Sequence, residues 1–316
     1  MNTQTKGYIL GAIAAATYGM NPLFALPLYA DGMNPDSVLF FRYLLALPIL
    51  AVMLKMRGRG FQISGRDIPQ LALFGILCAL SSLALFQSYR YMDAGIASTL
   101  LFVYPIMVAL IMTAVFRERL SVQTILCIVT ATCGIGLLYN GTDGATLSLT
   151  GSLLVGGSAL SYAVYIVGIN QTRLKDMATL QVTFYVLLFG LSVFVVSLLA
   201  GDEGLQLPGK WYLWGNLIAL GLFPTAISLL CTTAAIQYIG STPTAILGVL
   251  EPVTALFFGI TVFGEIVTGR DIAGIVLIIA AVVIVVAGGT VTHPLIRFRK
   301  MFPRLNRTSN HTEKQA

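Results

Sequence analysis

Two charged side chains, Glu251 and Arg42, lie inside long apolar stretches of the sequence. A charge at the centre of a membrane-spanning helix costs about 2.5–3.5 kcal/mol to insert, so it is expected to have a partner or a function. Glu251 stands near the middle of its segment, where it could bind a substrate ammonium group or a proton. The alternative is a buried acid, protonated or hydrogen-bonded, that holds helices together. The residue type alone leaves both open.

Arg42 stands closer to one end of its apolar segment than Glu251 does. A long basic side chain at that depth can extend to the lipid headgroups, and this snorkelling is the interpretation that we favour. Alternatively, Arg42 faces a cavity and meets a carboxylate there, including that of Glu251.

Four prolines interrupt the apolar segments. Pro252 follows Glu251 directly, and Pro22, Pro105 and Pro224 lie inside other segments. Proline removes a backbone donor and breaks or kinks a helix. Such breaks are tolerated in a membrane where the backbone faces protein or a water-filled cavity. The four prolines therefore indicate a cavity and are candidate helix-break and gating positions, although ordinary kinked packing would also account for them.

Polar and aromatic side chains recur at depths compatible with that cavity. A site for an amphipathic small molecule needs an apolar wall with a few hydrogen-bonding groups. Thr225, Ser228 and Thr232 share one helix face; for any single hydroxyl, bonding between membrane helices is the more frequent role. With Glu251 and Arg42, the candidate substrate-binding residues are Tyr18, Asn21, Gln87, Tyr104, Tyr162, Tyr165, Ser228 and Thr232.

The elements that must position these residues are membrane-spanning helices. Hydrophobic residues make up 57% of the 316 and charged residues only 10%, against roughly 25% charged in a soluble domain. A spanning helix needs about 20 predominantly apolar residues. Ten such segments follow one another in an all-α integral membrane protein, at about 7–29, 37–55, 69–89, 95–116, 121–139, 151–170, 179–200, 211–236, 242–263 and 271–290.

The second half of the chain repeats the first. The segment AILGVLEPVTALFFGITVFGE, which ends at Glu265, has an echo 147 residues earlier, so that Pro105 matches Pro252 and Glu118 matches Glu265. Tyr104 stands where the second half has Glu251, so the central acid belongs to one half alone. We expect Glu118 and Glu265 at helix ends.

The first segment also recurs. Its residues Gly7, Ala15, Thr17 and Tyr18 correspond, 144 positions on, to Gly151, Ala159, Ser161 and Tyr162. A cleaved signal peptide would have no reason to reappear in mid-chain, so we interpret this segment as a retained helix. Its small residues Gly7, Gly11, Ala15 and Gly19 recur at every fourth position and predict close helix packing without a ligand.

Five helices per half is an odd number, so the two repeats must cross the membrane in opposite senses. Fifteen of the nineteen lysines and arginines fall on the side of the N-terminus, against three in the opposite loops: Arg90, Lys210 and Arg270. The positive-inside rule therefore makes both termini cytoplasmic. We expect one repeat at 1–145, the second at 146–292 and a basic cytoplasmic tail at 293–316 that is disordered.

The paired segments YPIMVALIMTAVFRE and EPVTALFFGITVFGE resemble the EamA-type family of the drug/metabolite transporter superfamily. The resemblance covers about residues 7–290. It implies ten helices, a pseudo-two-fold relation between the halves and alternating access to a central cavity. It also implies a small-metabolite substrate, with export of amino acids or drug-like compounds the commonest assignment. Tyr104 at the position of Glu251 departs from symmetry within the motif itself.

The expected protein is therefore a secondary transporter of an amino acid, amine or drug-like compound in the inner membrane, with no cofactor. It could be coupled to protons, could work as an importer or exchanger, and could be a monomer or a homodimer. An enzyme, a channel and a scaffold are the rivals. Both histidines, His293 and His311, lie in the tail, and GxxxxGK is missing, so no metal site or ATP-driven pump is expected. The positive residues lie in loops and the tail, which fits a membrane face better than nucleic acid.

Overall fold

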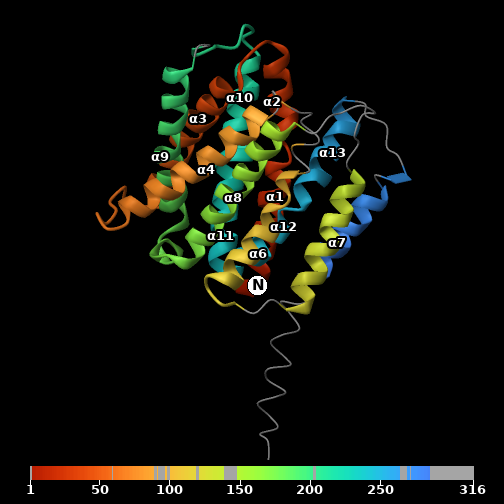
Figure 1. Cartoon of the computed structure of the whole chain (residues 1–316). Coiled ribbons are helices and arrows are strands. Elements are labelled where there is room, and N and C mark those ends of the chain that lie inside the picture. Colours follow the sequence, from red (N-terminus) through yellow and green to blue (C-terminus); the bar gives the residue numbers. More distant parts are fainter. Residues whose placement is uncertain are drawn as a thin grey trace, which may run out of the picture.

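The computed structural model describes residues 2–58, 60–88, 91, 97, 100–118, 121–138, 148–201, 204–263, 269–270 and 272–284. These residues form a bundle of helices, with no strand among them (Figure 1). Glu265 and the basic tail lie outside the described residues, so the expectations for them stay predictions.

The first half of the chain contains α1 (Thr3–Tyr18), α2 (Asn21–Ala30), α3 (Pro35–Met56), α4 (Ile68–Ser88), α6 (Tyr104–Ala114) and α7 (Val122–Leu138). The second half contains α8 (Leu149–Gln171), the short 3₁₀ helix η1 (Arg173–Asp176), α9 (Thr179–Ala200), α10 (Leu213–Gly221), the π-helix η2 (Leu222–Ile227), α11 (Ser228–Ile239), α12 (Ser241–Leu247) and α13 (Leu250–Phe263). A last apolar helix runs over Ile272–Ile284.

These helices make the chain a multi-pass membrane protein. Seven helical stretches are long and apolar enough to cross a membrane: Thr3–Ala30, Pro35–Met56, Ile68–Ser88, Leu149–Gln171, Thr179–Ala200, Leu213–Ile239 and Ser241–Val262. The apolar helices at the other three predicted segments, which lie within 95–116, 121–139 and 271–290, are shorter in the described part of the chain.

The helices are interrupted next to three of the four predicted prolines, whereas at Pro224 the helix continues with a changed hydrogen-bond pattern. The first span is divided between α1 and α2, with Pro22 in the first turn of α2. Pro105 lies in the first turn of α6, and Pro252 follows two residues after the start of α13. Pro224 lies within the π-helix η2, where the α-helical hydrogen-bond pattern is replaced by a wider one.

The most extensive packing joins the two halves. The helix α4 packs against α8 and α9, α1 packs against α11, and α3 packs against α9 and α10. At one edge of the bundle, α7 lies beside the helix Ile272–Ile284 (Figure 1). The repeats are therefore interlocked, so each half supports side chains of the other.

The small-residue stripe of α1 packs closely, as its spacing predicts. A methyl group added at Gly7 or Gly11 would lie 2.5 Å from a side-chain atom of Ile239 or Leu247. One added at Gly19 would lie 2.5 Å from the backbone carbonyl oxygen of Glu251. In lipid, close approach of backbones through small residues replaces the hydrophobic effect as a source of helix association.

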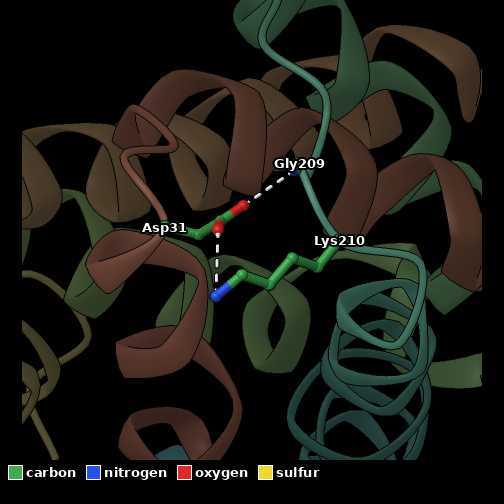
Figure 2. Close-up of polar contacts among 3 residues, drawn as sticks. All are labelled: Asp31, Gly209 and Lys210. Carbon is green, nitrogen blue, oxygen red and sulfur yellow. Dashed lines mark hydrogen bonds and ion pairs between the residues drawn. The ribbon is translucent and has the colours of Figure 1, made fainter.

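Polar contacts close one end of the bundle. The segment before α10 runs beside the turn after α2, where Asp31 Oδ2 accepts a hydrogen bond from the Gly209 amide at 2.7 Å (Figure 2). Asp31 Oδ1 lies 4.0 Å from Lys210 Nζ. Nearby, the Asn34 amide donates to Gln206 Oε1 at 2.6 Å. Asp31 and Lys210 thus lie at the same end of the bundle.

The contact of Gly19 with Glu251 gives a stability prediction. The variant Gly19→Ala places a methyl group against a carbonyl oxygen rather than against a flexible side chain, so overpacking is expected to cost about 1–3 kcal/mol. Its melting temperature in detergent should fall. Gly157→Ala in α8 is the matched control, because nothing lies within 4 Å of the added methyl group. Equal melting temperatures for the two variants would contradict the close packing of α1 on α13.

Candidate substrate-binding cavity

Two adjoining cavities lie inside the bundle. The first is lined by Tyr18, Arg42, Tyr43, Cys78, Ser81, Ser82, Leu85, Leu101, Tyr104, Tyr162, Leu229 and Glu251. The second is lined by Gly11, Ala14, Ala15, Tyr104, Tyr162, Ile166, Thr232, Thr244, Gly248 and Glu251. The centre of a water molecule has about 20 Å³ of free space in the first cavity and about 10 Å³ in the second. Tyr104, Tyr162 and Glu251 line both cavities.

Repeat-related residues meet at this place. Tyr18 and Tyr162 occupy corresponding positions of the two repeats, and so do Tyr104 and Glu251. All four line the first cavity. The ring of Tyr162 lies 5.0 Å from that of Tyr104, in an edge-to-face arrangement. The cavity therefore lies where the two halves of the chain converge.

Glu251 stands in the first turn of α13 and is partly buried. The helix α12 ends three residues before α13 starts, and the Glu251 amide donates to the Gly248 carbonyl at 2.9 Å. The N-terminal end of a helix carries partial positive charge, which stabilises a nearby carboxylate. Within the described part of the chain, no side-chain hydrogen bond of Glu251 is found. Its carboxylate is thus available to the cavity.

Arg42 projects into the bundle, and the expectation that it extends to the lipid headgroups is wrong. The residue is 2% exposed. Its Nε donates to Thr225 Oγ1 at 2.6 Å, and its Nη2 donates to the Pro224 carbonyl at 3.0 Å. The guanidinium carbon lies 5.3 Å from the centre of the Tyr18 ring. Depth along α3 permitted snorkelling, but the irregular helix η2 offers the guanidinium acceptors inside the protein.

Arg42 and Glu251 line the same cavity without pairing directly. No ion pair within 4.0 Å joins these two described residues. The direct Arg42–Glu251 pair considered from the sequence is therefore not formed. Opposite charges instead stand apart in one cavity, one from each repeat.

Of the other candidates, Thr232 lines the second cavity and Tyr18, Tyr104 and Tyr162 line the first. Asn21, Gln87, Tyr165 and Ser228 line neither. Gln87 donates to Asp36 Oδ2 at 3.1 Å. Ser228 Oγ donates to the Ala14 carbonyl at 2.9 Å and so joins α11 to α1. Tyr165 is fully buried, and its ring stacks on that of Tyr162 at 5.9 Å.

Sequence reasoning missed part of the lining. Tyr43, Cys78, Ser81 and Ser82 were not among the candidates. These residues come from α3 and α4 and line the first cavity. The hydroxyl of Ser158 joins α8 to α4 by donating to the Ser81 carbonyl at 2.7 Å. Serine and cysteine within apolar helices carry no distinctive spacing, so no sequence signal separated them from ordinary packing residues.

In the described ranges, no group of three or more His, Cys, Asp or Glu side chains lies close enough to hold a metal ion. The cavity supplies one carboxylate, one guanidinium, four tyrosines and small hydroxyl groups. Apolar walls with a few polar groups are typical of small-molecule sites.

The fold and the site define a multi-pass membrane protein with a charged cavity between two repeats. The sequence profile of the EamA-like transporter family matches residues 5–140 and again residues 149–287. The chain belongs to this transporter family.

Individual proteins with similar sequences are also named as transporters. An uncharacterized transporter of Archaeoglobus fulgidus is 29% identical over 86% of this chain and 93% of its own length. The uncharacterized inner membrane transporter YicL of Salmonella typhimurium is 23% identical over 90% of this chain and 96% of its own. A crystal structure of a protein with 16% identity has the same fold, with a TM-score of 0.75 over 89% of this chain and 96% of that one.

Gly248 gives a prediction about the wall between the cavities. Tyr104 Oη donates to the Ala245 carbonyl at 3.2 Å, and a methyl group added at Gly248 would lie 1.7 Å from that hydroxyl oxygen. Gly248→Ala should therefore lower the melting temperature through overpacking, by about 1–3 kcal/mol in stability. In the double variant Gly248→Ala/Tyr104→Phe the clash is relieved, because the nearest remaining ring carbon is 3.0 Å away.

The two changes should therefore be non-additive. Tyr104→Phe alone removes one hydrogen bond, for an expected loss of about 0.5–1.5 kcal/mol. A double variant less stable than Gly248→Ala by that same amount would show that the hydroxyl does not lie against Gly248.

Proposed function

We propose that this protein is a secondary transporter that moves a small metabolite across the inner membrane by alternating access. In this proposal all ten apolar segments cross the bilayer, the two five-helix repeats have inverted topology, and both termini are cytoplasmic. Inverted repeats, discontinuous helices and a site where the repeats meet are a recurrent plan of secondary transporters. The name of YicL as an inner membrane transporter supports the choice of membrane.

One observation carries the proposal: a carboxylate and a guanidinium from different repeats line one cavity inside an apolar bundle. A charge is costly within a membrane protein and is retained where it serves transport, relay or binding. A merely structural pair would be expected to join directly, whereas Arg42 and Glu251 do not.

The proposed substrate is an amphipathic molecule such as an amino acid, an amine or a drug-like compound. Glu251 would bind its ammonium group or exchange it for a proton, and the tyrosine rings would contact its apolar part. A proton on Glu251 in one half of the cycle would couple transport to the proton gradient. Export is the direction proposed, because it is the commonest assignment in the family that the sequence resembles.

An importer or exchanger would use the same architecture, so direction needs a flux measurement. A scaffold or a membrane enzyme belongs to a different class, and we propose that the chain is neither. The interior charges support this choice, since a scaffold would have no use for them. Either a monomer or a homodimer is compatible with a cavity contained within one chain.

Counterflow into proteoliposomes tests the proposal. Phenylalanine, phenethylamine and 3-phenylpropionate are suitable probes because they share one ring and differ only in their charged groups. A carrier gives saturable exchange of at least one preloaded probe. Linear, non-saturable flux would identify a channel, and no flux of these or of a wider set of metabolites and drugs would favour an enzyme or scaffold.

Glu251→Gln gives a sharper prediction. It keeps the shape of the side chain and removes its charge, so the variant should fold and lose at least tenfold in phenethylamine counterflow, as expected for one lost charged contact. Glu118→Gln is the matched control, because Glu118 follows the last turn of α6 and is exposed.

Thermal shift with phenethylamine separates binding from turnover in the same variants. Stabilisation by phenethylamine should disappear in Glu251→Gln and persist in Glu118→Gln. If Glu251→Gln is stabilised and transports as the parent does, Glu251 has a structural role only.

A further inference from the structure

The guanidinium of Arg42 is held in one orientation. Two of its three nitrogens are engaged by the second repeat, Nε by the hydroxyl of Thr225 and Nη2 by the carbonyl of Pro224. The ring of Tyr18 lies 5.3 Å from the guanidinium carbon. A side chain with many rotatable bonds is thereby reduced to one pose.

The irregular helix explains why these acceptors are available. Pro224 has no amide hydrogen, so it cannot donate to the Leu220 carbonyl four residues earlier. The hydroxyl of Thr225 donates to that carbonyl instead, at 2.8 Å. Because the hydroxyl proton of Thr225 is used in this bond, its oxygen is free to accept a hydrogen bond from Arg42 Nε. The hydroxyl of Thr225 therefore replaces the hydrogen bond that Pro224 cannot make and also accepts one from the guanidinium.

The π-helix is a one-residue insertion peculiar to the second repeat. Before it, Gly75 of α4 corresponds to Gly221, 146 residues on; after it, Ser81 corresponds to Ser228, 147 residues on. A π-helix arises from such an insertion into an α-helix, often at a functional site. The first repeat keeps a continuous α-helix over this stretch.

The one-residue insertion of η2 lies in the same contact between helices as Arg42. A methyl group added at Gly75 would lie 2.6 Å from the Val186 carbonyl oxygen, and one added at Gly221 would lie 3.3 Å from the Arg42 carbonyl oxygen. Arg42 and Val186 are 144 positions apart, the spacing that relates Tyr18 to Tyr162. The glycine that packs on the Val186 backbone belongs to the regular helix α4. The glycine that packs on the Arg42 backbone directly precedes the π-helix η2.

The third nitrogen of the guanidinium is left over. Nη1 is buried and has no hydrogen-bond partner within the described residues, while Arg42 lines the first cavity. A buried charged donor without a partner is costly, and an ionised acceptor forms a strong, short bond with it. Glu251 does not supply that acceptor, because no ion pair joins the two side chains.

We propose that Arg42 Nη1 binds an anionic oxygen of the transported molecule, such as a carboxylate, and that Thr225 with the π-helix positions it. This proposal rests on the transport function proposed above, since it names one chemical group of the substrate. Arg42 touches the ligand, whereas Thr225 acts through Arg42 and is a positioning residue.

The test is anion binding to the purified full-length protein, measured by thermal shift with 3-phenylpropionate, which has a carboxylate and no ammonium group. The parent should be stabilised in a saturable way. Arg42→Met should lose this response. Thr225→Val, which keeps the shape and removes the hydroxyl, should raise the Kd about tenfold, as expected for a charged hydrogen bond. Thr225→Ser should restore binding.

Thr233→Val in α11, the helix that continues η2, is the matched control. Thr233 is equally buried, and its hydroxyl donates to the Leu229 carbonyl at 2.8 Å, but it does not contact Arg42. It should bind 3-phenylpropionate as the parent does. Phenethylamine, which lacks the carboxylate, should show the same Kd in Thr225→Val as in the parent, which separates a loss of anion binding from general damage.

An absent response of the parent to 3-phenylpropionate would overturn the proposal, and so would equal binding by Thr225→Val and the parent. The Thr225 pair keeps the test decisive if Arg42→Met fails to fold. Binding requires no turnover, so anion binding without counterflow would refute transport and leave the Arg42 site standing. Counterflow of phenethylamine without anion binding would refute the Arg42 site and leave the transport function standing.

Discussion

The burial of a full positive charge is the constraint on which the arrangement of the bundle depends. Arg42 is 2% exposed among apolar helices, where water cannot solvate it. An unpaired charge in such a place is strongly destabilising, and fixed hydrogen-bond acceptors have to replace the solvent. The hydroxyl of Thr225 and the carbonyl of Pro224 do so. The carbonyls of a regular α-helix are engaged by its own amides, so the irregular helix and the arginine belong together.

The partly buried carboxylate of Glu251 is accommodated in a different way. Glu251 stands in the first turn of α13, where the partial positive charge of a helix start favours a negative group. Its counterpart Tyr104 begins α6 in the same manner, and both residues precede a proline. A helix start in mid-bundle leaves backbone amides without partners, which is tolerated only beside protein or a cavity. The duplicated proline thus explains why these two positions face the same space.

The sequence predicts the framework better than it predicts the site. Helix interruptions at prolines and close packing at a glycine stripe were predictable, because both follow from the shape of the residue itself. Arg42 was misplaced because depth along a helix gives no information about which helix lies opposite. Gln87 was a candidate because it is polar, yet its side-chain amide donates a hydrogen bond to Asp36, outside the cavity. The π-helix was detectable in principle, since the offset between the repeats changes from 146 to 147 between Gly75 and Ser81.

Interlocking of the repeats limits how the cavity can open. Because α3 packs against α9, α10 and η2, the first repeat cannot move as one body away from the second without breaking these contacts. Arg42 lies on α3 but is bonded to η2, so the guanidinium must move together with both elements or lose its acceptors. Glu251 belongs to α13, which packs through its backbone on Gly19 of α1. Any motion that changes the distance between the two charges must therefore move the packed pair α3 and η2 relative to the packed pair α1 and α13. In the chain, the break at Met20 between α1 and α2 lies between α1 and α3.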